Sequence, residues 1–257
     1  MPTCVAVLGL GEAGGAITAD LVAAGAEVRA YDPKVPAPAG TVACADEADA
    51  VAGAQLVLSV NSAPDAPIAL RNAASGLEAG TVWADLNTGS AAMKAALAEQ
   101  LATVAAGAGF VDVALMSPVP GRGIHTPMLA SGAAAGRYAE LMRPFGASVD
   151  VLTGPPGEAA TRKLLRSVFY KGLAAAVVEA LTAAREAGLE DWLRDNIATE
   201  LAGFDRATVQ RLEQGSRQHA LRRSHEMAAA TELLTDLGVP ARIAAASRDL
   251  LAELAAD

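Results

Sequence analysis

Apolar residues follow two different patterns along the chain, and the change falls near residue 157. From residue 4 to about 152, short apolar runs alternate with alanine-rich segments, which is the strand and helix rhythm of a parallel sheet. The runs are almost continuously apolar, as expected for strands that helices cover on both faces. The predicted strands are CVAVL, EVRAY, TVAC, QLVLSV, TVWADL, FVDVAL, MLASG and SVDVL.

After the Gly-Pro-Pro-Gly segment at 154–157, only helical spacing remains. It predicts one long helix from Glu158 to about Ala187 and further helices over 189–204, 206–238 and 241–257. The expected architecture is therefore α/β, with a parallel-sheet domain at 1–157 followed by an all-α domain at 158–257.

The first predicted strand is followed by three glycines with the spacing G-x-G-x-x-G. Gly9 permits the tight turn, Gly11 lets the backbone approach a pyrophosphate, and Gly14 lets the next helix pack closely on the sheet. The alternative is a glycine turn that binds nothing, but Asp32 at the end of the second strand favours a Rossmann-type dinucleotide-binding domain. The expected cofactor contacts are Gly9, Leu10, Gly11, Glu12, Ala13, Gly14, Asp32, Asn61 and Asn87.

Asp32 also predicts which dinucleotide binds. A carboxylate at this strand end can accept hydrogen bonds from the adenosine ribose hydroxyls and repels a 2′-phosphate, which favours NAD over NADP. Lys34, two residues further on, can offset that repulsion, so NADP remains the alternative.

Composition narrows the classes of function. The net charge is −9 and the chain has no block of lysine or arginine, which argues against a nucleic-acid partner. Cys4 and Cys44 lack metal-ligand spacing, so we expect no metal site, two core cysteines and a reducing, cytoplasmic environment. No apolar stretch approaches the ~20 residues of a membrane span, and the N-terminal segment has no basic leader.

Several motifs resemble the β-hydroxyacid dehydrogenase and 6-phosphogluconate dehydrogenase superfamily. They are GLGEAGGAI after the first strand, DLNTGS at 85–90 and FVDVALMSPVPGRGIHTPMLASG at 110–132. More narrowly, RKLLRSVFYKG and HALRRSHEM resemble an uncharacterised branch with its own C-terminal helical domain. The resemblance implies an NAD(P)-dependent oxidoreductase acting on CH–OH donors, with a helical domain that binds substrate and forms a homodimer.

The resemblance also implies a catalytic lysine at the start of the helical domain. Aligning Gly157 with the first glycine of the family's G-x-G-x-x-x-K stretch places Lys163 at the lysine that transfers the proton. On an ideal helix Ser167 and Tyr170 lie within about 40° of Lys163, and Lys171 lies about 80° away and about 12 Å further along. Ser167 would orient the reacting groups and Lys171 would bind an anionic end of the substrate. The alternative is that these lysines belong to a solvated helix face.

The substrate is the least determined part. Thr88, Gly89, Ser117 and Tyr170 are the expected substrate contacts, but the family's Ser-Gly-Gly carboxylate site is replaced by Met116, Ser117 and Pro118. A small, anionic hydroxy acid or its carbonyl counterpart is the leading expectation. Imine reduction is the same-chemistry alternative, and a dinucleotide-binding regulator without turnover is the alternative from another class.

One further group falls on a single predicted helical face. His219, Arg222, Arg223 and Glu226 have offsets of 0, 3, 4 and 7, so they either close the site from a partner subunit or form an ion-paired surface. His125, in the glycine-rich loop, is a weaker candidate for substrate contact.

Overall fold

The computed structural model describes residues 3–256. The chain divides into two compact units, Met1–Arg166 and Ser167–Asp257, and the division falls inside one long helix. The domain boundary expected at residue 157 stays a prediction. Among the described residues, no helix is both long and apolar enough to span a membrane.

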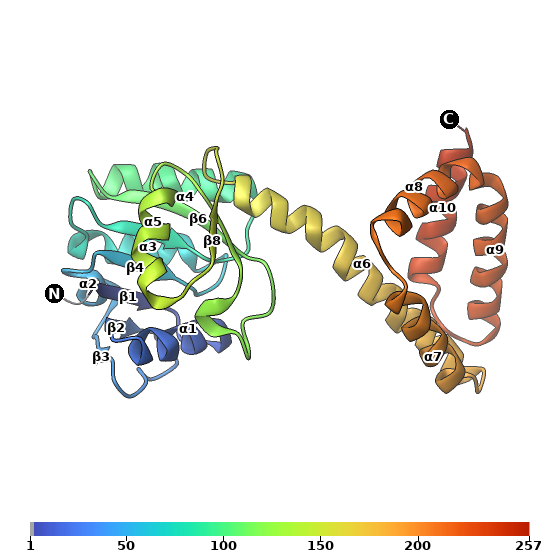
Figure 1. Ribbon diagram of the computed structural model, residues 1–257, viewed down its shortest axis with the longest axis horizontal. Helices are drawn as coiled ribbons and strands as arrows, with labels where there is room; N and C mark the ends of the chain where they lie inside the picture. The colour runs from blue at the N-terminus through green and yellow to red at the C-terminus, as the bar shows by residue number, and fades with distance from the viewer. Residues whose placement is uncertain (1–2, 257) are drawn as a thin grey trace. The chain divides into compact units, whose positions relative to one another are not determined.

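The N-terminal unit contains an eight-stranded sheet with the strand order β3-β2-β1-β4-β5-β6-β7-β8 (Figure 1). All eight strands coincide with the predicted apolar runs, so the expected α/β fold is confirmed. The strands are β1 Cys4–Leu8, β2 Glu27–Tyr31, β3 Val42–Ala43, β4 Leu56–Ser59, β5 Val82–Asp85, β6 Gly109–Leu115, β7 Met128–Ser131 and β8 Val149–Val151.

One part of the sheet is not parallel, which corrects the expectation. β7 pairs with β6 in the antiparallel direction, whereas every other neighbouring pair in the sheet is parallel. The reason is the connection between them, because it contains only the short 3-10 turn η2 (Gly123–His125) rather than a crossover helix.

Helices cover both faces of the sheet because successive residues of each strand point to opposite sides (Figure 1). Val5 and Val7 of β1 belong to one core with α1 (Glu12–Ala23) and α5 (Ala135–Met142). Ala6 and Leu8 belong to the second core, which is completed by α2 (Glu47–Val51), α3 (Ala66–Ala73) and α4 (Ala91–Val104). Cys4 and Cys44 are free and only partly buried at the edge of this second core, not inside it as expected.

The helical region begins with α6, which contains the division between the two units. Its elements are α6 Glu158–Glu186, α7 Glu190–Ala202, α8 Arg206–Gln218, α9 Ala220–Asp236 and α10 Arg242–Ala256. Within the C-terminal unit α9 packs against α10, and its small core is formed by Ala183, Leu234, Val239 and Ala244. Much apolar surface stays exposed, including the side chains of Val168, Trp192, Val209 and Leu221, each more than 60% exposed.

The single helix predicted over 206–238 is wrong, because the chain bends at His219. His219 has a non-helical backbone (φ −118°, ψ 25°), so α8 ends and α9 begins there. Arg223 Nη1 reaches back across the bend and donates to Ser216 Oγ at 2.8 Å. This contact between the two helices stabilises a break that helical spacing alone does not indicate.

Candidate active site

The turn between β1 and α1 shows why two of its glycines are required by the fold. Gly9 has φ +99°, and a Cβ there would lie 2.7 Å from the backbone of Val60 and Asn61. A Cβ on Gly14 would overlap the carbonyl oxygen of Gly9. A Cβ on Gly11, in contrast, would meet no atom within 4 Å among the described residues other than its two chain neighbours. The turn is therefore tightly packed on its inner side and open at Gly11.

The helix that follows the turn begins without a side-chain cap. Gly11 is the N-cap of α1 and offers no side chain, so the first amides of the helix have no side-chain acceptor there. Amides at a helix N-terminus attract anions because they carry unpaired N–H groups and the positive end of the helix dipole. The open Gly11 and the uncapped α1 fit the pyrophosphate of a dinucleotide.

Asp32 links the end of β2 to this turn. Its Oδ2 accepts a hydrogen bond from the Leu10 amide at 2.8 Å, and its Oδ1 accepts from the Lys34 and Val35 amides at 2.8 and 3.0 Å. Partial burial raises the pKa of Asp32, but these three hydrogen bonds outweigh it and hold the pKa below the ordinary value. The carboxylate stays ionised and keeps acceptor capacity for a ribose hydroxyl.

Two cavities open along the carboxyl ends of the strands. The first, of about 450 Å³, is lined by Gly11, Tyr31, Asp32 and Lys34 among others. The second, of about 530 Å³, is lined by Glu12, Ala13, Asn61, Asn87, Thr88, Ser117 and Lys163 among others. Residues 60–62 line both cavities, so the two adjoin. Both cavities lie near β1, where the strand order of the sheet reverses. Doubly wound sheets bind their ligands at such a point.

The second cavity brings together most of the predicted catalytic and substrate-binding residues of the N-terminal unit. Lys163, from the second turn of α6, is partly buried and lies at its wall together with Thr88 and Ser117. Gly89 borders a small void that Asn87, Thr88 and Lys163 also line. The Ser117 hydroxyl oxygen is buried and has no hydrogen-bond partner among the described residues.

Three of the predicted residues belong to the other unit. Ser167, Tyr170 and Lys171 follow the division within α6, and Lys171 is exposed. A Cβ on Gly172 would meet no atom within 4 Å among the described residues outside its own helix turn, so packing does not require a glycine there. The roles expected for Ser167, Tyr170 and Lys171 stay predictions.

The remaining candidates have structural partners. Arg222 forms an exposed ion pair with Glu226 at 2.6 Å, Arg223 donates to Ser216 Oγ, and His219 lies at the bend as the N-cap of α9. A role of these four residues in closing the site stays a prediction. His125 Nδ1 lies 3.0 Å from the carbonyl oxygen of Gly146.

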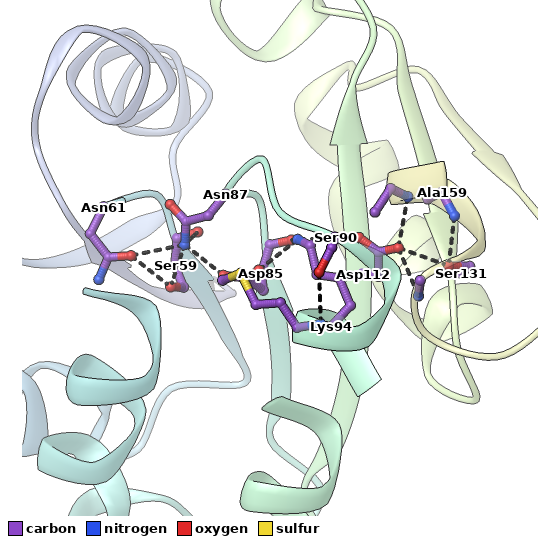
Figure 2. A network of polar contacts seen from close by, with 12 residues as sticks. Ser59, Asn61, Asp85, Asn87, Ser90, Lys94, Asp112, Ser131 and Ala159 are labelled. Atoms are coloured by element: carbon purple, nitrogen blue, oxygen red, sulfur yellow. Dashed lines mark hydrogen bonds and ion pairs between the residues drawn. The ribbon is translucent and has the colours of Figure 1, made fainter. Parts of the chain in front are cut away.

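A buried ionic network behind the cavity was missed by sequence reasoning. Lys94 of α4, Asp85 at the end of β5 and Asp112 within β6 are all fully buried (Figure 2). Lys94 Nζ lies 2.6 Å from Asp85 Oδ2 and 3.2 Å from Asp112 Oδ1. In the sequence alone, Lys94 has the pattern of a solvent-exposed lysine in an alanine-rich helix. The available signal was a carboxylate within each of two apolar strands, because a buried charge requires a partner.

Residues 4–136 match the family described as the NAD binding domain of 6-phosphogluconate dehydrogenase. Residues 184–254 match a domain of unknown function, DUF1932. An uncharacterised 28.5 kDa protein encoded in the 7S RNA 5′ region of Methanothermus fervidus is 34% identical over 84 residues. That match covers 33% of this chain and 32% of the curated relative.

Solved structures extend the similarity to the whole chain. A conserved hypothetical protein from Sinorhizobium meliloti 1021 is 30% identical, with 98% of this chain and 88% of that chain covered and a TM-score of 0.63. A conserved protein of unknown function, described as structurally similar to 3-hydroxyacid dehydrogenases, is 28% identical, with 98% and 97% covered and a TM-score of 0.61.

An imine reductase from Streptomyces aurantiacus has the same fold at 21% identity, with 98% and 94% covered and a TM-score of 0.79. The resemblance drawn from the motifs is thus confirmed. The chain belongs to the family defined by the NAD-binding domain of 6-phosphogluconate dehydrogenase, in a branch whose helical domain has no assigned function.

Proposed function

We propose that this protein is an NAD(P)-dependent oxidoreductase that transfers a hydride between the nicotinamide and a small hydroxy acid or its carbonyl counterpart. The observation that carries the proposal is the position of Lys163, which lines a cavity that adjoins the dinucleotide groove at residues 60–62. A titratable amine at that place is available to a substrate held beside a bound nicotinamide.

Four residues would hold the cofactor. Gly11 and the amides of Glu12 and Ala13 fit the pyrophosphate, and Asp32 fits a ribose hydroxyl. The chemistry that NAD(P) supplies when bound is acceptance or donation of a hydride. The charge of Asp32 favours NAD over NADP in this proposal, although an imine reductase of similar fold from Myxococcus stipitatus was solved with NADP+.

Lys163 would move the proton that accompanies the hydride. When an alcohol is oxidised, the hydride leaves the carbon and the neutral Lys163 amine accepts the hydroxyl proton; when a carbonyl is reduced, the ammonium form donates a proton to the oxygen. Ser117 contributes a buried hydroxyl at the same cavity, and Thr88 lines its wall. Lys171 would bind the anionic end of the substrate, with Ser167 and Tyr170 beside it on the helix.

Imine reduction is the second candidate, and one residue of the cavity lining, Glu12, supports it. Pro118 and Pro120 line the wall after Ser117, and Glu12 places a carboxylate at the same cavity as Lys163. That carboxylate would repel an acidic substrate and attract an iminium cation. In this reaction Lys163 would act on the substrate nitrogen instead of an oxygen.

Substrate screening separates these functions. Hydroxy acids, sugar acids and cyclic imines are each offered with NAD(H) and NADP(H), and the change in nicotinamide absorbance is followed. Turnover of hydroxy acids or their carbonyl forms supports the leading proposal, and turnover of imines alone selects the second. Cofactor binding without any turnover would indicate a regulator. We expect the protein in the cytoplasm, in line with its two free thiols.

A further inference from the structure

The buried ionic network contains more negative than positive charge. Two carboxylates, Asp85 and Asp112, face the single ammonium group of Lys94, and all three side chains are fully buried. Lys94 Nζ also donates to the carbonyl oxygen of Asp85 at 2.9 Å. A buried charge without full compensation is costly, so the second carboxylate requires further donors.

The start of α6 supplies those donors. Asp112 Oδ2 accepts hydrogen bonds from the Gly157 amide at 3.0 Å and the Ala160 amide at 2.9 Å. Ser131 Oγ donates to the same oxygen at 3.3 Å and accepts from the Ala159 amide at 3.1 Å (Figure 2). Asp112 and Ser131 thus satisfy amides that have no acceptor within the helix, and the negative charge lies at the positive end of α6.

The other end of the network reaches the cavity wall. Asp85 Oδ1 accepts a hydrogen bond from Asn87 Nδ2 at 2.6 Å, and Asn87 Nδ2 also lies 2.8 Å from Asn61 Oδ1. Asn61 and Asn87 both line the second cavity. A continuous set of polar contacts therefore joins the wall beside the dinucleotide groove to the first turn of α6 (Figure 2).

We propose that Asp85, Lys94 and Asp112 form a positioning device that holds the first turn of α6, and with it Lys163, in register with the cavity wall at Asn87. Lys163 follows Ala160 by three residues, which is less than one helical turn, so any shift of the helix start moves it. Lys94 is fully buried and acts through Asp112. The catalytic part of this inference rests on the proposed function.

Stability alone does not account for such a network. Replacing a buried ion cluster by apolar residues of similar size is often neutral or stabilising, because the desolvation of the charges offsets their attraction. Directional contacts to the Gly157 and Ala160 amides, in contrast, define where the helix starts. The arrangement therefore indicates that the role of the ionic network is to orient the start of α6.

Amide hydrogen exchange tests the anchor without any substrate. In Asp112→Ala we expect the amides of residues 157–160 to exchange ~10-fold faster than in the wild type, the effect of losing a charge-assisted hydrogen bond. Asp112→Asn keeps an acceptor oxygen and should show a smaller increase. Leu101→Ala, a buried change later in the same helix as Lys94, is the control for general destabilisation.

Wild-type exchange rates at 157–160 in folded Asp112→Ala or Asp112→Asn would overturn the proposal, as would an equal increase in Leu101→Ala. A second readout is acetylation of Lys163 by acetic anhydride, measured by mass spectrometry relative to Lys34 in the same sample. In Lys94→Met, Lys163 should be acetylated faster relative to Lys34 than in the wild type. An unchanged ratio of Lys163 to Lys34 acetylation would contradict the positioning role. Amide exchange and Lys163 acetylation both test the positioning role even if the wild-type protein converts no substrate. Absence of any turnover would refute only the proposed function.

Kinetics then tests the positioning role with whichever hydroxy acid or imine the wild type converts. Lys94→Met should lower kcat ~10-fold or more while the Kd for NADH stays within about twofold, as expected when only the placement of a catalytic group is lost. Leu101→Ala should lower Tm and keep kcat. Equal losses in both variants would show that the network is merely structural.

Discussion

The carboxylate of Asp112 in β6 accepts a hydrogen bond at 2.9 Å from the amide of Ala160, which lies 48 residues later in the chain. This contact ties a buried strand to the first turn of the helix that carries Lys163. The sheet thus anchors the helix start three residues before Lys163, the predicted proton-transfer group.

Replacing Lys163 by methionine should lower kcat by ~10²-fold or more while the affinity for NAD(P)H is kept, because a proton-transfer group is removed and the dinucleotide groove is left intact. Steady-state kinetics and fluorescence titration of the reduced cofactor measure the two quantities. Arg162→Met, at the neighbouring exposed position that pairs with Glu158, is the matched control and should leave kcat unchanged. Comparable losses in both variants would refute a specific role for Lys163.

Lys171→Met should chiefly raise KM for acidic substrates, by about tenfold for the loss of one charge-assisted hydrogen bond, with a smaller effect on kcat. Neutral substrates serve as the internal control and should be unaffected. Loss of all turnover in Lys171→Met, together with near-normal turnover in Lys163→Met, would reverse the two assignments.

NADH should bind more tightly than NADPH, because the ionised Asp32 repels a 2′-phosphate. Asp32→Asn should shift the ratio of the two Kd values about tenfold toward NADPH, since the charge is removed while an acceptor oxygen is kept. Lys34→Met is the companion variant and should weaken NADPH binding only. Arg29 is held by Asp49 at 2.7 Å and is not expected to contribute. Tighter binding of NADPH by the wild type would contradict the NAD preference.

The protein should be a homodimer formed through the helical unit, because its exposed apolar side chains need a covering surface. Light scattering of the wild type should give twice the monomer mass. Val168→Glu, at a position 76% exposed, should shift the protein toward the monomer, whereas Val104→Glu in the N-terminal unit should not. A wild-type monomer at high micromolar concentration would refute the prediction.

The helical unit should lose stability in acid through Glu179, which caps α10. Partial burial raises the pKa of Glu179, but hydrogen bonds from the amides of Ile243, Ala244 and Arg242 outweigh it and hold the pKa below its ordinary value. The stabilising contribution is therefore complete above the ordinary glutamate pKa of about 4.3 and is lost as the pH falls toward the folded value.

Thermal unfolding measures this effect. Lowering the pH from about 7 to about 3 should reduce Tm less in Glu179→Gln than in the wild type, because the variant has no carboxylate to protonate. Glu253→Gln, on the exposed surface of α10, should retain the wild-type dependence on pH. Identical pH profiles of wild type and Glu179→Gln would exclude the cap as a contributor.

Local pattern alone determined the eight strands and the glycine turn. Strands that helices cover on both faces are almost continuously apolar, which makes the central strands β1, β4, β5 and β6 visible as apolar runs. The roles of Gly9 and Gly14 were equally visible, because a positive φ and a close backbone approach each require a glycine. The choice of Lys163 as the proton-transfer candidate came from family resemblance rather than from helical spacing, and its role stays a prediction.

Only the tertiary structure decided the direction of β7, the bend at His219 and the partners of Lys94. The direction of β7 depends on its pairing with β6 in the sheet, and the bend is stabilised by a side-chain contact between two helices, from Arg223 to Ser216. Lys94 has the spacing of a solvated helical lysine, yet folding places it between the carboxylates of two neighbouring strands. Helical periodicity predicts which residues share a face of a helix. Which charged groups lie against that face is determined by the packing of the whole domain.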